Sequence, residues 1–201
     1  MPQNMKKNLK NKRLSMALKQ ISDPVQRQEI VSEYALLLAE HNDKNKMLMR
    51  HLQNAILPAV AVYRVLPRHG ISKTDARRII RSNVLDAAKP MAKVFQTLGR
   101  LPFFYALFRC MCKASMGSMF GDAGWNMQWK VSNSKEIRWD CHSCFYDGVL
   151  SGYGMPELTP IFCESDDVMY GNIPGIKWGR TKTIGRGAEV CDFCFTKARH
   201  S

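Results

Sequence analysis

The hydrophobic pattern of this chain changes its period at one place, Gly121-Asp122-Ala123-Gly124. Before it, apolar residues recur every three or four positions, as in amphipathic helices, and after it they fall in short alternating runs, as in strands. Helices first and antiparallel strands last predict an α+β fold. We therefore expect an N-terminal, bundle-like helical region followed by a small antiparallel sheet with one or two short helices.

Start and stop signals divide the helical region. Ser22-Asp23-Pro24 predicts a helix start, because a capping side chain precedes a proline whose missing N–H costs nothing in the first turn. Ser72 and Asp75 form a predicted capping box that opens a helix ending at Gly99.

Two prolines interrupt these helical patterns. Pro58 predicts a kink or a break, and Pro90 is expected to split the helix that contains it, since a proline inside a helix removes one hydrogen bond. A fourth, strongly apolar helix is expected over residues 101–118. Beyond the change of period, IKWGRTKTI and EVCDFCFTK are expected to pair as the two strands of a terminal hairpin.

Three regions follow from this division. Residues 1–22 are a basic lead that is poorly ordered or helical, 23–124 are the helical region, and 125–201 are an α+β, cysteine-rich region. With 201 residues, the chain has the length of one ordinary domain. We expect 125–201 to form one compact domain with 23–124.

The positive charge lies in the first part of the chain. Residues 1–124 hold 21 Lys and Arg against 8 Asp and Glu, whereas residues 125–201 hold 9 of each, so the first part carries the whole formal charge of +13. A field of this sign attracts nucleic acid, acidic lipid or a carboxylate substrate, and a solvated basic surface explains it equally well. The basic part lacks interleaved aromatic residues and any known reading motif, so nucleic acid is not the expected partner.

Targeting signals are not apparent. No apolar run reaches the ~18–20 residues that span a bilayer, because Arg109 and Lys113 interrupt residues 101–120. The basic start is not followed by the apolar stretch of a secretory signal. The seven cysteines are an odd number, which disfavours a disulfide framework. We expect a cytoplasmic protein with reduced thiols and no membrane partner; a homo-oligomer is left open.

Two Cys-x-x-Cys pairs raise the alternative of a structural zinc site. They are Cys141 with Cys144 and Cys191 with Cys194. The 46 residues between the pairs exceed a common ribbon spacing, and neither pair contains the glycine or proline of a tight knuckle. VCDFCF also has the pattern of an uninterrupted strand, in which residues three apart point to opposite faces. A basic zinc-ribbon nucleic-acid-binding protein therefore stays a disfavoured alternative, and no metal or other cofactor is expected.

Reactive chemistry is the other interpretation of these thiols. Cys144 lies at a predicted strand-to-helix junction, where a helix N-terminus can lower a thiol pKa. Cys163 is followed closely by Asp166 and Asp167, so one short segment supplies a thiol and carboxylates. A buried, partly protonated carboxylate can act as both acid and base. These residues are equally compatible with a reactive site and with cysteines that only pack in the core.

The C-terminal stretch resembles the L-2-amino-thiazoline-4-carboxylic acid hydrolase family of bacteria. The likeness covers residues 138–195 and lies in GMPELTPIFCESDD and in IKWGRTKTIGRGAEVCDFCF. Cys141 and Cys194 fall outside the family pattern, which leaves each Cys-x-x-Cys pair with one member. The residues that match it are Cys144, Cys163, Asp166, Arg180, Thr183, Gly187, Cys191, Asp192 and Phe193.

The resemblance implies a hydrolase of non-peptide C–N bonds. Its named reaction opens a cyclic isothiourea with water and gives a carbamoyl derivative of cysteine, so the expected partner is a small carboxylate with a cyclic amidine or isothiourea. A thiolate of Cys144 or Cys163 would attack the C=N carbon while Asp166 moves the proton. Arg180 would pair with the substrate carboxylate. A sensor that binds a small molecule or a metal without turnover is the alternative. The predicted catalytic residues are Cys144, Cys163, Asp166 and Cys191, and the predicted substrate-binding residues are Arg180, Thr183 and Asp192.

Overall fold

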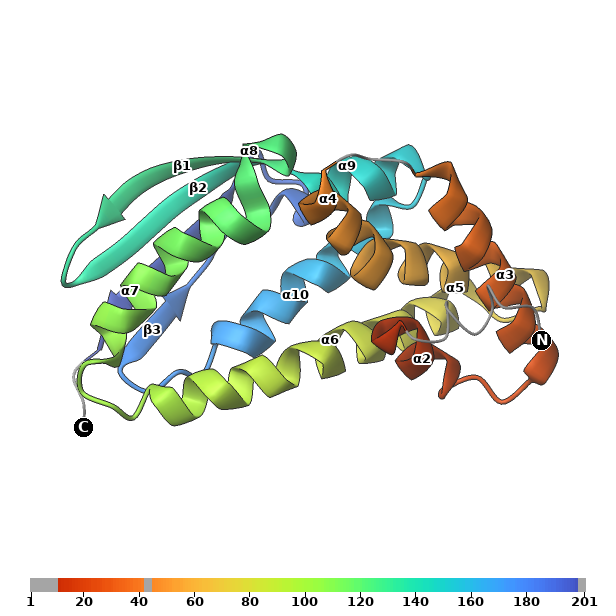
Figure 1. Cartoon of the computed structure of the whole chain (residues 1–201), viewed down its shortest axis with the longest axis horizontal. Helices are drawn as coiled ribbons and strands as arrows, with labels where there is room; N and C mark the ends of the chain where they lie inside the picture. The colour runs from red at the N-terminus through yellow and green to blue at the C-terminus, as the bar shows by residue number, and fades with distance from the viewer. Residues whose placement is uncertain (1–10, 42–44, 199–201) are drawn as a thin grey trace. The chain divides into compact units, whose positions relative to one another are not determined.

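The computed structural model describes residues 11–41 and 45–198 and divides the chain into two compact units (Figure 1). Unit 1 is Met1–Ala87 and unit 2 is Ala88–Ser201. The division falls inside helix α6 (Lys73–Leu98), which contributes to both units. It stays a prediction that residues 23–124 and residues 125–201 form one domain.

Unit 1 is helical throughout its described part. Its buried side chains are almost all aliphatic and form the core between the helices; the largest of them include Leu14, Ile30, Leu37, Leu52, Ile56, Leu57 and Leu66. Besides the first part of α6, its elements are α2 (Lys12–Leu18), α3 (Pro24–Glu40), α4 (Lys46–His51), the π-helical turn η1 (Leu52–Ile56) and α5 (Leu57–Arg68).

The predicted capping signals of unit 1 are present. Asp23 accepts a hydrogen bond from the Val25 N–H at 2.7 Å and starts α3. Ser72 accepts one from the Asp75 N–H at 3.0 Å at the start of α6, and its hydroxyl donates to the Asp75 carboxylate at 2.7 Å. These bonds satisfy N–H groups that have no partner within the helix.

The predictions made for the two helix prolines, Pro58 and Pro90, have different outcomes. Before Pro58 the chain widens into the π-helical turn η1, a local irregularity of the expected kind. The expectation that Pro90 splits its helix is wrong, because α6 continues through it to Leu98. Pro90 lies on the exposed side of α6, where water can satisfy the carbonyl that loses its partner. Gly99 follows the helix end as predicted, and a Cβ there would meet the Pro174 carbonyl oxygen at 2.8 Å.

Unit 2 combines helices with one four-stranded antiparallel sheet, which confirms the α+β prediction. The strand order is β1-β2-β4-β3. The strands are β1 (Trp125–Ser132), β2 (Glu136–Cys144), β3 (Ile176–Gly179) and β4 (Cys191–Lys197). The helical elements besides the end of α6 are α7 (Phe104–Ser115), η2 (Met116–Phe120), α8 (Gly121–Gly124), α9 (Phe145–Gly152), η3 (Pro156–Leu158), α10 (Thr159–Tyr170) and η4 (Ile184–Arg186).

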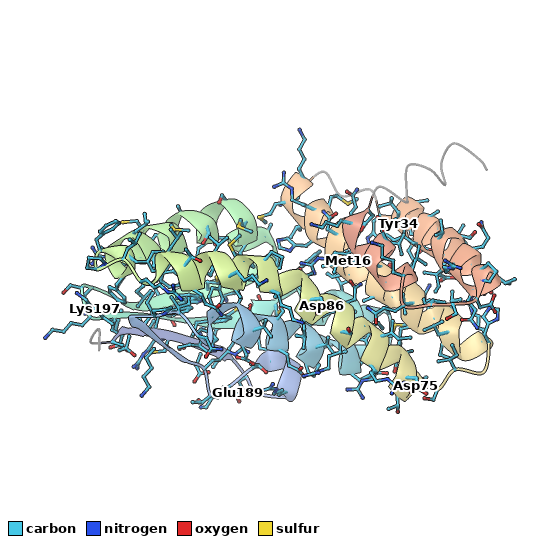
Figure 2. The ribbon with its side chains drawn as sticks, turned by 90° about the horizontal axis from the view of Figure 1, so that it is seen from below. Met16, Tyr34, Asp75, Asp86, Glu189 and Lys197 are labelled. Atoms are coloured by element: carbon cyan, nitrogen blue, oxygen red, sulfur yellow. The ribbon has the colours of Figure 1, made fainter. Side chains whose placement is uncertain are left out.

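One face of this sheet carries the core of unit 2. Trp139 pairs with Phe193 in the register of β2 and β4, and their rings are stacked with centroids 5.0 Å apart. Helices α7 and α10 cover this face: Phe108 of α7 and Tyr170 of α10 both contact the ring of Phe195. Figures 1 and 2 show α7 running along the strands on this side. Aromatic packing therefore fixes the position of α10 against β4.

The terminal hairpin is shorter than predicted. The predicted strands ran over residues 176–184 and 189–197, whereas residues 180–190 form a loop that contains η4 and a left-handed Gly187 (φ 87°). The reason is a side-chain contact across the loop: the carboxylate of Asp192 accepts hydrogen bonds from the backbone N–H groups of Thr181 and Lys182 at 2.9 and 2.6 Å. A backbone N–H group that is hydrogen-bonded to a side chain cannot also form the inter-strand hydrogen bond that would lengthen a strand.

No helix in the described ranges is long and apolar enough to cross a membrane.

Candidate functional site

The three predicted catalytic cysteines lie in three different elements of unit 2. Cys144 ends β2, Cys163 lies in α10, and Cys191 begins β4. Each is close enough to the other two that the charge of one thiolate would raise the pKa of the next. The three thiols therefore lie within electrostatic range of one another in unit 2, and their convergence on one cavity stays a prediction.

Cys144 occupies the N-cap position of α9, as the predicted junction implied. Burial raises the pKa of its thiol, and the backbone N–H groups of Tyr146 and Asp147 act in the opposite direction. These groups lie in the first turn of α9, where unpaired N–H groups point toward the cap.

Cys163 has the most varied surroundings of the three thiols. Burial raises its pKa, while the Thr183 hydroxyl, the Arg180 guanidinium and the Gly185 N–H favour its thiolate. The Thr183 hydroxyl is buried and makes no well-aligned hydrogen bond to any group in the described part of the chain. Because the thiol is a weak acceptor and the thiolate a strong one, this hydroxyl is placed to stabilise the charged form of Cys163.

Cys191 is bonded to the loop that follows β3. Its Sγ accepts a hydrogen bond from the Ile184 N–H at 3.2 Å, which links β4 to η4. Burial raises the pKa of this thiol to about 12. A thiol with this pKa is almost wholly neutral at pH 7, so Cys191 is the least suited of the three to act as a nucleophile.

Asp166 and Arg180 form a partly buried ion pair beside Cys163. Arg180 Nη1 donates to Asp166 Oδ2 at 2.8 Å. Burial nevertheless raises the pKa of Asp166 to about 6, against the opposing charge and hydrogen bond of Arg180. The Asp166 side chain keeps 30% of its surface exposed, so a substrate can reach it. Its pKa lies close enough to neutrality for both acid and base roles.

Arg180 is enclosed by protein groups. Only 2% of its side chain is exposed, and its Nη2 donates at 2.8 Å to both the Cys163 carbonyl oxygen and the Asp167 carboxylate. The guanidinium also lies over the rings of Trp178 and Phe193, 5.3 and 5.6 Å from their centroids. Arg180 therefore fastens the end of β3 to α10 and supplies positive charge. Direct pairing with a substrate carboxylate would require it to release one of these partners.

Asp192 is bound by its own loop. Its carboxylate accepts from the Thr181 hydroxyl at 2.6 Å in addition to the two backbone N–H groups of the loop. Burial alone would raise the pKa of Asp192, but these hydrogen bonds together lower it. The structure thus places this predicted substrate-binding residue where it shapes the loop that carries Thr183 and Gly185.

Two further residues, Gly185 and Asp167, contact the site but are not among the predicted site residues. A Cβ on Gly185 would lie 2.7 Å from Thr159 Cγ2 and 3.0 Å from Cys163 Sγ, so the loop touches α10 there. Asp167 accepts from Trp178 Nε1 at 3.1 Å and lies 4.0 Å from Arg186 Nη2. The sequence shows the glycines on either side of Arg186 and the neighbouring carboxylates Asp166 and Asp167. It does not show that the loop contacts α10, because that contact depends on the fold.

The two Cys-x-x-Cys pairs do not meet at one point. Cys141 lies opposite Cys191 in the register, and Cys194 lies opposite Arg138. Residues three apart on β4 point to opposite faces of the sheet, as predicted for Cys191 and Cys194. The Cys194 thiol is accordingly 3.6 Å from the Glu136 carboxylate. In the described ranges, no group of three or more His, Cys, Asp and Glu side chains has an arrangement that could hold a metal.

A family comparison bears directly on this geometry. The family model described as L-2-amino-thiazoline-4-carboxylic acid hydrolase matches residues 49–195. The chain belongs to this family. The match to the L-2-amino-thiazoline-4-carboxylic acid hydrolase family covers well over half of the chain, including α9, α10 and the loop after β3. Its description indicates a hydrolase. No match was found among curated proteins or among solved structures.

Proposed function

We propose that this member of the L-2-amino-thiazoline-4-carboxylic acid hydrolase family opens the ring of a small cyclic amidine or isothiourea that carries a carboxylate. The observation that carries the proposal is the position of Asp166, whose pKa is about 6, one helical turn after Cys163 and paired with a buried arginine. A thiol and a titrating carboxylate on one helix face can attack an electrophilic carbon and move the accompanying protons.

Cys163 is the nucleophile in this proposal. Its thiolate is favoured by a side-chain hydroxyl, a guanidinium and a backbone N–H, whereas Cys144 has backbone N–H groups only. Cys191 is assigned a positioning role, because its sulfur accepts a hydrogen bond from the loop. Asp166 would take the Cys163 proton as the sulfur approaches the substrate.

Ring opening then proceeds in two balanced stages. In the first, the Cys163 sulfur bonds to the amidine carbon, and the C=N electron pair moves to the ring nitrogen. Asp166 returns the proton to that nitrogen. As the ring C–N bond breaks, a proton of the exocyclic amino group passes to the leaving nitrogen, which becomes a free amine, and the amidine carbon stays bonded to the enzyme sulfur as C=NH.

In the second stage, water adds to that carbon: its oxygen bonds to the carbon and one of its protons goes to the imino nitrogen. Asp166 takes the proton of the new hydroxyl as the carbonyl forms and the C–Sγ bond breaks, and it returns that proton to the Cys163 sulfur, so that a carbamoyl product with a free amine leaves. One water is consumed and the enzyme is restored.

The substrate carboxylate needs a positive partner at the mouth of the site. Arg186 suits this role because 56% of its side chain is exposed, and because it adjoins Gly185, which touches Cys163. Arg180 contributes charge from the buried side, and its direct pairing with the carboxylate stays a prediction. Thr183 would hydrogen-bond to the thiolate.

The test is ring opening of 2-amino-thiazoline-4-carboxylate by the purified chain, followed as formation of the carbamoyl product. Cys163→Ser should reduce kcat at least about 100-fold, since an alcohol is a far weaker nucleophile at this pH. The control is Cys110→Ser, which replaces an exposed cysteine of α7. Substrate binding without turnover in the unaltered chain would instead support the sensor function. Full activity of Cys144→Ser, Cys163→Ser and Cys191→Ser would exclude covalent catalysis.

A further inference from the structure

Cys144 is the thiol of the site that the proposed reaction leaves without a role. It is only partly buried, as is Cys163, whereas Cys191 is buried. Burial raises the pKa of the Cys144 thiol, but at the N-cap of α9 the backbone N–H groups of Tyr146 and Asp147 oppose this rise. A partly exposed thiol beside such donors is placed to react.

A ring contact holds the segment of Cys144 against the segment of Cys163. The ring centroids of Tyr146 and Phe162 are 4.9 Å apart, so the first turn of α9 packs on α10. Tyr146 is two residues after Cys144, and Phe162 immediately precedes Cys163. The charge of a Cys163 thiolate accordingly acts on the Cys144 thiol. The fold thus gives the proposed nucleophile a second, partly exposed thiol as a neighbour.

We propose that Cys163 and Cys144 are a peroxide-reactive pair, in which peroxide oxidises Cys163 and Cys144 then closes a reversible disulfide with it. The inference rests on the proposed function, because it takes Cys163 as the reactive thiol of the site. It adds a modification site whose reactant is hydrogen peroxide. Such a disulfide protects a reactive thiol, since it forms before the sulfinic acid that thiol reductants do not reverse.

The proposed oxidation takes place in two steps. In the first, the Cys163 thiolate attacks one oxygen of hydrogen peroxide, the O–O bond breaks, and a sulfenic acid forms on the sulfur. The departing hydroxide takes the proton that the Cys163 thiol released and leaves as water. In the second, the Cys144 thiolate attacks the Cys163 sulfur, the S–O bond breaks, and the hydroxide leaves as water with the Cys144 proton. Two thiols lose two electrons in all, and one peroxide becomes two waters.

The other thiols near the site are less suited to close this bond. Cys191 is buried, and its Sγ accepts the Ile184 N–H at 3.2 Å, a contact that a disulfide would disturb. Cys141, opposite Cys191 in the register, is also buried, and its thiol donates to the Ser143 carbonyl oxygen at 3.0 Å. Burial raises the pKa of both thiols to about 12, so both are almost wholly neutral at pH 7. Cys144 is therefore the expected partner.

The test is mass spectrometry of the full chain after treatment with hydrogen peroxide. The chain is exposed to about a tenfold molar excess of peroxide, and its remaining thiols are alkylated. Cleavage with trypsin and at Glu157, which lies between the two cysteines, then separates them. The proposal predicts a disulfide that joins the Cys144 peptide to the Cys163 peptide and that dithiothreitol releases. Fragmentation distinguishes Cys144 from Cys141, which lies in the same peptide.

Ring opening gives a second readout, in which each variant is compared with itself before treatment. In the unaltered chain, peroxide should lower the rate at least about tenfold, and dithiothreitol should restore it. In Cys144→Ser the loss should persist after dithiothreitol, and the Cys163 peptide should carry sulfinic acid. Cys144→Ala is a second variant for the same measurements, and circular dichroism should show that both are folded. The control Cys110→Ser, which replaces an exposed thiol of α7, should behave like the unaltered chain.

Three results would overturn the inference. The first is a Cys163 that stays reduced in peroxide. The second is an oxidised Cys163 without a disulfide to Cys144, or with one to Cys141 or Cys191 instead. The third is full recovery of Cys144→Ser with dithiothreitol. A Cys144–Cys163 disulfide in a chain that does not open the ring would contradict only the proposed function, whereas ring opening without this disulfide would contradict only the present inference.

Discussion

At the scale of single residues, the site depends on how Asp166 is surrounded. Arg180 would by itself keep this carboxyl ionised, yet burial outweighs the arginine and raises the pKa to about 6. The charge of Asp167, which Arg180 also binds, raises the pKa of Asp166 further. A carboxyl that titrates near neutrality can accept the thiol proton and return it within one turnover.

This pKa predicts the pH dependence of the reaction. The carboxylate of Asp166 is the form that accepts the thiol proton, so kcat/KM should rise as the pH increases through about 6. Asp166→Asn should lose this rise and most of the activity. Glu189→Gln, an exposed carboxylate of the same loop region, is the control and should keep the profile. A rise near pH 6 that persists in Asp166→Asn would show that another group titrates.

At the scale of elements, the loop between β3 and β4 brings the site together. It is pinned at Asp192, at Cys191 through the Ile184 N–H, and at Gly185 against α10. Each contact joins residues from different elements, so the loop, rather than either strand, positions Thr183 beside Cys163.

Substitution of Gly185 by alanine tests this close approach. The new Cβ would lie 2.7 Å from Thr159 Cγ2 and 3.2 Å from the Pro160 backbone nitrogen, and must displace the loop from α10. We expect kcat to fall at least about tenfold, because a displacement of about 1 Å can have such an effect on reacting groups. Gly148→Ala is the matched control, since no atom lies within 4 Å of its Cβ. Unchanged kcat in Gly185→Ala would contradict the role of this contact.

The Asp192 contacts predict a measurable effect on stability. Asp192→Ala removes three hydrogen bonds and should lower the free energy of unfolding by about 1–3 kcal/mol at pH 7. Because the folded chain lowers the pKa of Asp192, its contribution is present above the unfolded pKa and is lost as the pH falls through the folded value. Urea unfolding should therefore show the difference between Asp192→Ala and the unaltered chain shrinking in acid. A difference that does not depend on pH would contradict this assignment.

Features that depend on contacts between neighbouring residues were predicted from the sequence, and features that depend on contacts between distant residues were not. Asp23 and the Ser72–Asp75 box act within one helical turn, and both were predictable from neighbouring residues. The short β3 and the uninterrupted α6 were not, because Asp192 acts across ten residues and because the exposure of Pro90 on its helix depends on the fold. The convergence of the cysteines was a hypothesis from the family resemblance, and no spacing rule could show that Arg180 is buried.

At the scale of the whole molecule, α6 is one continuous helix that belongs to both compact units. We therefore expect the units to unfold together, in agreement with the prediction of one domain. Leu37→Ala, in the core of unit 1, should lower the free energy of unfolding by about 2–5 kcal/mol and shift a single calorimetric transition. Leu36→Ala is the adjacent control, because that side chain is 64% exposed. Two separate transitions, of which only one responds to Leu37→Ala, would contradict a single cooperative domain.

The most direct test of the central claim is mass spectrometry of the chain quenched during turnover of 2-amino-thiazoline-4-carboxylate. The account predicts a substrate-derived mass on the peptide containing Cys163, absent from Cys163→Ser and retained in Cys110→Ser. It also predicts that Asp166→Asn slows both the appearance and the loss of this adduct. Ring opening at an undiminished rate by Cys163→Ser, with no adduct on any cysteine of the unaltered chain, would contradict it.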